Sequence, residues 1–173
     1  MEELKLFKEQ LKNMRPEGWD QIPDIDLYMD QVISYMSRQH IGLEPLGDES
    51  LTAAMINNYV KHGLLPRAKG KRYSREHLAY LTAICLLKQV LSVSETGALL
   101  EKEMEHSDIR TFYDQYLEIL DETFTETASR LCEEESKESL AELALTMAVE
   151  SYAKMLACKK ILKEIAPAPE AKK

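Results

Sequence analysis

The chain has few of the residues that stabilise small secreted folds or interrupt helices. Its 173 residues include three cysteines, six glycines, six prolines and one tryptophan. An odd number of cysteines, each inside an apolar-periodic stretch, argues against a disulfide framework and favours a reducing compartment. No apolar run approaches the ~20 residues that a bilayer span needs, and no signal-peptide pattern is present. We therefore expect a cytoplasmic protein with no membrane partner.

Signals for β-strands are also scarce. Runs of β-branched residues and two-residue glycine turns are nearly absent, whereas apolar residues recur at three- and four-residue steps almost throughout. With 45% hydrophobic and 30% charged residues, the chain is long enough to close a sizeable core. The sequence thus predicts an all-α protein.

The net charge of -8 is distributed unevenly along the chain. Residues 52–89 carry seven cations and one acid, whereas residues 101–150 carry 15 acids and four cations. A uniformly acidic surface would repel nucleic acid, but a basic island is where a polyanion docks. The alternative is a solvated cationic face that only balances its acidic neighbours.

Capping residues divide the middle of the chain into helices. Thr52, Ser74 and Ser92 each precede an apolar-periodic run, and Ser92 with Glu95 forms a capping box. Gly63 suits the left-handed position after a helix. These signals predict helices over 52–62, 75–90 and 93–104.

The remaining segments complete the predicted organisation. A further helix is expected to start near Asp24, and a turn at 133–136 separates two long acidic helices. The expected parts are an N-terminal helix over 1–18, a head over 19–104, an antiparallel helical hairpin over 105–165 and a disordered tail over 166–173.

The predicted helix 52–62 has an apolar back and a polar front. At 100° per residue, Met55, Ile56, Tyr59 and Val60 share one face. The opposite face holds Ala54, Asn57, Asn58 and Lys61. Asparagine amides can pair with an adenine edge or hold phosphate, lysine supplies a charge, and a small alanine allows close approach. This face has the chemistry of a DNA-recognition helix.

A basic loop, residues 66–73, follows this helix directly. Its cations, together with the next one along the chain, are Arg67, Lys69, Lys71, Arg72 and Arg75. Cations gathered on a loop beside such a helix suit a phosphate backbone, and salt should weaken the binding strongly. The expected partner is double-stranded DNA.

The same segment resembles the winged helix-turn-helix of the MerR regulators. The likeness covers roughly residues 51–104 and rests on Tyr59, 63–66 (GLLP), 72–74 (RYS), His77, Leu78, Leu81, Ile84, Leu87, Lys88, 91–95 (LSVSE), Leu99 and Leu100. Residues 26–32 (DLYMDQV) and 55–61 (MINNYVK) further resemble a bacterial family called domain of unknown function 1836.

The resemblance to MerR regulators implies a DNA-binding transcriptional regulator. Helix 52–62 would enter the major groove, the basic loop would be a small wing, and the C-terminal helices would form a homodimer. Asn57 and Asn58 stand where those regulators usually carry an Arg-Tyr pair. The alternative is therefore a protein-interaction module that reuses the winged-helix head and does not bind DNA.

Patterns typical of enzymes and metal sites are not found in the sequence. There is no Ser-His-Asp order, nucleotide-binding glycine motif or pair of catalytic carboxylates. The histidines lack the spacing of zinc ligands. We expect no catalysis, cofactor or metal, and the sequence indicates no particular effector.

An aromatic cluster is expected in the acidic helices. Its members are Phe112, Tyr113, Tyr116, Phe124 and Tyr152. These residues could line an effector pocket, but aromatic stripes at helical spacing usually form a core or a dimer interface.

Overall fold

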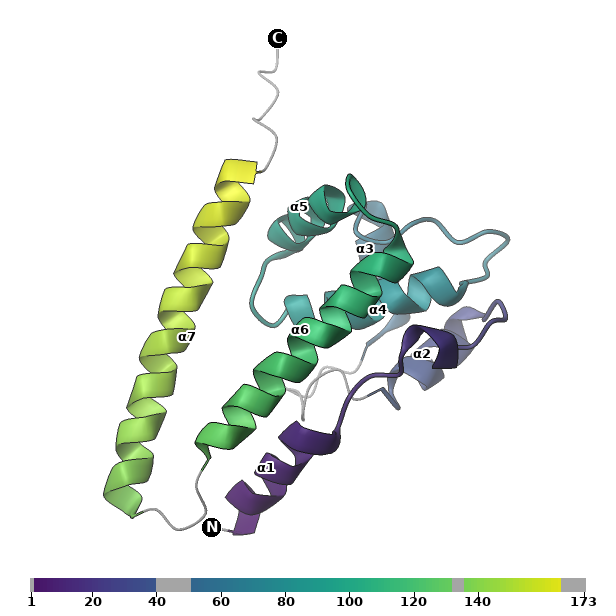
Figure 1. Cartoon of the computed structure of the whole chain (residues 1–173). Helices are drawn as coiled ribbons and strands as arrows, with labels where there is room; N and C mark the ends of the chain where they lie inside the picture. Colours follow the sequence, from purple (N-terminus) through teal and green to yellow (C-terminus); the bar gives the residue numbers. More distant parts are fainter. Residues whose placement is uncertain (1, 40–50, 132–135, 166–173) are drawn as a thin grey trace.

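A computed structural model describes residues 2–39, 51–131 and 136–165, and helices account for almost all of their regular structure (Figure 1). In chain order they are α1 (Glu2–Asn13), the short 3-10 helix η1 (Trp19–Gln21), α2 (Met29–Met36), α3 (Ala53–Lys61), α4 (Arg75–Leu87), α5 (Val93–Met104), α6 (Ile109–Arg130) and α7 (Lys137–Ile165). The described residues form no strand, only two isolated antiparallel bridges. The all-α prediction is confirmed for this part of the chain.

Helix α4 lies at the centre of the fold and packs against α2 and α6. Its sequence is apolar on nearly every side, which is the pattern of a helix enclosed by neighbours. Its side chains with 0–1% exposure are Leu78, Ala79, Leu81, Thr82, Ala83 and Ile84. Thr82 is accommodated among them because its hydroxyl donates to the Leu78 carbonyl at 2.9 Å.

Helix α2 begins later than predicted. It starts at Met29 rather than near Asp24, because Leu27 is held in an extended pairing with Tyr73. The two residues exchange both backbone hydrogen bonds at 2.9 Å. Ile25, which a helix starting near Asp24 would include, is 68% exposed. The prediction was wrong because pairing with a distant segment leaves no trace in local periodicity.

The C-terminal helices α6 and α7 run in opposite directions but have different partners (Figure 1). α6 packs along α4 and α1, and its side chains Phe112, Tyr113, Tyr116 and Leu120 belong to the main core. The chief partner of α7 is α5, and Lys159 pairs with Glu95 there at 3.4 Å. The two helices therefore do not form the closely packed hairpin that the sequence predicted over 105–165.

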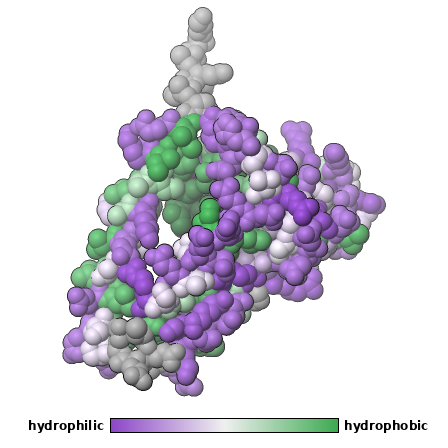
Figure 2. Space-filling view, in the orientation of Figure 1, coloured by the Kyte–Doolittle hydropathy of each residue, from purple (hydrophilic) through white to green (hydrophobic). Residues whose placement is uncertain are grey.

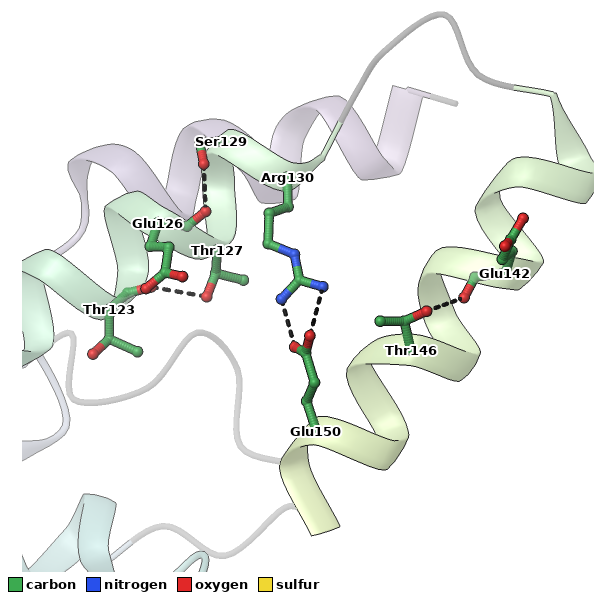
Figure 3. Close-up of polar contacts among 8 residues, drawn as sticks. All are labelled: Thr123, Glu126, Thr127, Ser129, Arg130, Glu142, Thr146 and Glu150. Carbon is green, nitrogen blue, oxygen red and sulfur yellow. Dashed lines mark hydrogen bonds and ion pairs between the residues drawn. The ribbon is translucent and has the colours of Figure 1, made fainter. Parts of the chain in front are cut away.

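The start of α7 meets α6 and α1 in a second, smaller core. Leu11, Ala128 and Leu131 are buried there, and Leu143 and Met147 of α7 pack against them. Figure 3 shows the polar link beside this core, where the Arg130 guanidinium donates to both Glu150 oxygens at 2.5 and 3.2 Å. This ion pair lowers the pKa of Glu150 and raises that of Arg130.

Some predicted features lie outside the described residues. These are most of the turn at 133–136 and the tail at 166–173. The predicted capping box of α5 is confirmed: Ser92 N–H donates to Glu95 Oε2 at 2.8 Å, and Glu95 N–H donates to Ser92 Oγ at 3.2 Å. These hydrogen bonds, and then Lys159, lower the pKa of Glu95.

Candidate nucleic-acid interface

Helix α3 begins and ends as its sequence predicts. Thr52 is the N-cap, and its hydroxyl accepts a hydrogen bond from the Met55 N–H at 3.2 Å. Gly63 follows the helix with φ of 75°, and the Leu64 N–H donates to the Tyr59 carbonyl at 2.9 Å. This is the Schellman arrangement, which needs a residue that tolerates the left-handed region.

The two faces of α3 differ in burial as their side chains predict. Ile56 and Tyr59 are 0% and 3% exposed and belong to the main core. The exposed front consists of Ala54, Asn57, Asn58 and Lys61. Because the back is packed and both ends are capped, the front is presented on a fixed backbone.

The basic loop contains a tight turn at its tip. Gly70 and Lys71 have φ of 57° and 62°, and the Arg72 N–H donates to the Lys69 carbonyl at 3.0 Å. Positive φ at both central positions is the signature of a type I′ turn, the type that joins paired strands. The cations of the loop therefore project from a turn of defined geometry.

Tyr73 anchors the base of this loop in the core. It is 5% exposed, its backbone pairs with Leu27, and its ring meets the edge of His77 at 5.5 Å between centroids. Burial raises the pKa of the Tyr73 hydroxyl. Tyr73 is thus a packing residue, and the loop cannot move without disturbing the core.

Two of the predicted cations have partners within the chain. Arg72 donates to the Tyr28 hydroxyl at 3.1 Å, and its guanidinium lies 5.2 Å from the centre of the Tyr28 ring. Arg75 lies 3.6 Å from an Asp24 oxygen and 5.9 Å from the centre of the Trp19 ring. Only 20% of the Arg75 side chain is exposed, so this residue stabilises the base of the loop.

The other predicted cations are exposed, and none has an acidic partner among the described residues. Lys61, Arg67, Lys69 and Lys71 are all exposed. Within the described ranges, no carboxylate lies at ion-pair distance from any of the four. An unneutralised cation keeps its full attraction for a polyanion, so these four set the charge of the surface.

The sequence did not identify the aromatic residues beside the basic loop. Tyr28 and Trp19 contact Arg72 and Arg75, although both aromatics lie far from these arginines along the chain. The one signal in the sequence was that both residues are aromatic, because aromatic rings commonly pack against arginine guanidinium groups. Locating them requires knowing that Leu27 pairs with the loop.

The predicted aromatic cluster is only partly assembled. Phe112, Tyr116 and Phe124 line an apolar groove of about 350 Å³ between α4, α5 and α6. Tyr113 is fully buried and donates to the Glu17 carbonyl at 2.7 Å. Tyr152 does not join them, because it is 60% exposed on the outer side of α7. Its inclusion in one cluster was wrong.

The described residues contain neither a cluster of metal ligands nor a membrane-spanning helix. No three histidine, cysteine, aspartate or glutamate residues there are grouped so that they could hold a metal ion. None of the described helices combines the length and hydropathy that a bilayer crossing requires.

The structure defines an all-helical domain with an ordered basic loop between two of its helices. A family model described as a domain of unknown function, DUF1836, matches residues 17–116, which is more than half of the chain. The chain therefore belongs to this family. The match runs into α6, in agreement with the place of that helix in the main core. Nothing among the curated proteins or the solved structures matches the chain.

Proposed function

We propose that this protein is a DNA-binding transcriptional regulator with a MerR-like winged helix-turn-helix head. In this proposal α3 lies in the major groove and the basic loop is the wing that contacts phosphates. The observation that carries the proposal is a set of four exposed cations, next to the amide-rich front of α3, that have no acidic partner among the described residues.

The chemistry of the α3 front supports base contact. Asn57 and Asn58 each offer an amide donor and acceptor, the pair of groups that matches the major-groove edge of adenine. Both are exposed, and Ala54 one turn earlier adds no bulk that would keep the backbone from the groove. Lys61, near the end of the helix, can reach a phosphate as a point charge.

The rigidity of the basic loop supports phosphate contact. Its tip is closed by the Arg72 to Lys69 hydrogen bond, and its base is held by the pairing of Tyr73 with Leu27. Cations on a fixed turn lose less conformational entropy on binding than cations on a free chain. The partners of Arg72 and Arg75 hold this turn in place, and Lys69 and Lys71 are left for the ligand.

The position of α7 also supports the proposal. In Figure 1 the connection between α3 and α4 reaches the right edge of the molecule, whereas α7 stands at the left edge. The acidic first half of α7 therefore does not cover the basic loop. A polyanion approaching the loop meets the cations before it meets this helix.

A salt series tests the proposal. A labelled random double-stranded DNA pool is titrated with the full chain by fluorescence anisotropy, starting at low salt. We expect binding that weakens steeply with salt, and a slope in the double variant Lys69→Gln/Lys71→Gln that is smaller by about two, because each lost phosphate contact removes about one.

The matched control removes two lysines elsewhere. Lys12 and Lys102 are each paired with a neighbouring glutamate, so Lys12→Gln/Lys102→Gln changes the net charge equally without touching the basic loop. We expect this variant to keep the slope of the unmodified chain. Binding no tighter than that of an unrelated acidic protein, or the same slope in all three chains, contradicts the proposal.

A second candidate is a protein-interaction module that does not bind DNA. The partners of Arg72 and Arg75 favour it, because both guanidinium groups are used within the chain rather than offered to phosphate. Under this alternative the exposed loop would receive an acidic protein surface, and the anisotropy titration would show no binding of duplex DNA.

A further inference from the structure

Helix α7 is apolar on two opposite faces, and the described residues cover only one of them. The inner face includes Leu143, Met147 and Leu162, which are buried or half-buried against the rest of the molecule. The outer face carries Leu145, Val149, Tyr152 and Leu156, with exposures of 66%, 61%, 60% and 48%. A helix with apolar residues on both sides is normally buried on both sides.

The outer residues follow the spacing of a coiled-coil seam. They are separated by four, three and four positions, which is the alternation of a heptad repeat. Figure 2 shows hydrophobic side chains at the surface over α7, along the left edge of the view. The stripe therefore has the form of a helix-pairing surface rather than of scattered exposed residues.

The charged residues that extend this spacing differ at the two ends. Continuing the alternation leads to Glu142 and Glu138 in one direction and to Lys159 and Lys163 in the other. Over the whole helix, the half from 137 to 150 has three glutamates and one lysine, and the half from 151 to 165 has four lysines and one glutamate.

We infer that the outer face of α7 pairs with the same face of a second copy, in antiparallel orientation. A two-fold axis between residues 150 and 151 places Leu145 opposite Leu156 and Val149 opposite Tyr152 of the other copy. The same axis places Glu138 opposite Lys163, and it brings Glu142 level with Lys159, whose ammonium also pairs with Glu95 of α5 at 3.4 Å. A parallel pair would instead set glutamate against glutamate and lysine against lysine.

The register is internally consistent because a single two-fold axis gives every residue of the stripe a suitable partner in the other copy. The four apolar residues pair among themselves and the acidic end meets the basic end, with no layer left mismatched. A symmetric pair also contacts itself through the same patch on both copies, as two-fold dimers do. This inference extends the proposed function but does not rest on it, since α7 lies away from the basic loop (Figure 1).

Sedimentation velocity over a wide range of concentrations, in the absence of DNA, tests the pairing. We expect the unmodified full chain to pass from monomer to dimer as concentration rises. Val149→Asp buries a carboxylate in the seam of both copies and should leave only monomer. Because Val149 is exposed in the single chain, this variant keeps its fold, which circular dichroism verifies.

A charge swap tests the orientation. Glu138→Lys alone and Lys163→Glu alone each turn two attractive contacts into repulsive ones, so each should weaken the dimer by about tenfold. The double variant carrying both changes should restore it. A chain that stays monomeric throughout, a dimer that persists in V149D, or a double variant as weak as the singles overturns the inference. Since no step involves DNA, failure of the DNA titration leaves these readings intact.

Discussion

Helices α6 and α7 have similar sequence patterns and very different surroundings. α6 packs on α4 and α1, and Tyr113 at its centre is completely buried. α7 is longer, yet Leu162 is its single buried side chain, and a row of large apolar residues along its outer side faces solvent. One helix is part of the main core of the domain, and the other is attached to it.

The difference shows what an apolar stripe specifies. Periodicity states that one side of a helix is covered, but it carries no information on the covering element. The stripe of α6 is satisfied by helices that come earlier in the chain. α7 has two stripes, and the described part of the chain covers only the inner one. We therefore expect stability to depend mainly on α6, and α7 to be available for the proposed association.

Matched tyrosine substitutions give the largest expected contrast. Tyr113→Ala removes a ring with 0% exposure and its hydrogen bond to Glu17, so we expect a loss of about 3–5 kcal/mol in the free energy of unfolding. Tyr152→Ala removes an exposed ring and should change the stability of the monomer by less than about 0.5 kcal/mol. Urea denaturation at a concentration where the chain is monomeric measures both. Similar losses would falsify the division between the two helices.

Shortening Leu162 should have an intermediate effect. Buried Leu→Ala changes usually cost about 2–5 kcal/mol, but α7 can detach while the core stays folded, so we expect about 1–2 kcal/mol. Hydrogen exchange should accelerate in the second half of α7 and stay unchanged in α6. Faster exchange in both helices would mean that they unfold as one unit.

The Arg130–Glu150 ion pair gives the smallest effect, and one that depends on pH. Arg130 lowers the pKa of Glu150, so the folded state holds this carboxylate in its charged form more strongly than the unfolded state does. The stabilisation is present above the unfolded pKa and is lost as pH falls through the lower folded pKa. Glu150→Gln should remove that dependence.

Amide exchange measures the effect of this pair. At neutral pH, Glu150→Gln should speed exchange in the first half of α7, and acidification of the unmodified chain should have the same effect. The control Glu164→Gln removes an exposed glutamate that pairs with Lys160 at the far end of the helix. An equal response to both substitutions would contradict a specific stabilising effect of the Arg130–Glu150 ion pair.

Local signals predicted much of the fold. Thr52 and Gly63 delimit α3, and the Ser92–Glu95 capping box starts α5, because caps act through neighbouring backbone groups. The buried back and exposed front of α3 also followed from a single helical projection. In each case the determining contacts lie within a few residues, so the sequence is sufficient.

Long-range contacts account for what could not be predicted. The start of α2 depends on the pairing of Leu27 with Tyr73, and the roles of Arg72 and Arg75 depend on Tyr28 and Trp19. None of these pairs is close in sequence. The two faces of α7 were readable in principle, but choosing which one faces the core required the positions of α5 and α6.

Selection of DNA sites tests the central claim most directly. The full chain is used to select fragments from a random duplex library at low salt, beside the variant Asn57→Ala/Asn58→Ala, which alters only exposed side chains of α3. The account predicts a recurring sequence in the unmodified selection and its loss in the variant, with residual salt-sensitive binding through the basic loop. Enrichment of no sequence, or of the same sequence by both chains, would contradict the reading of DNA by α3.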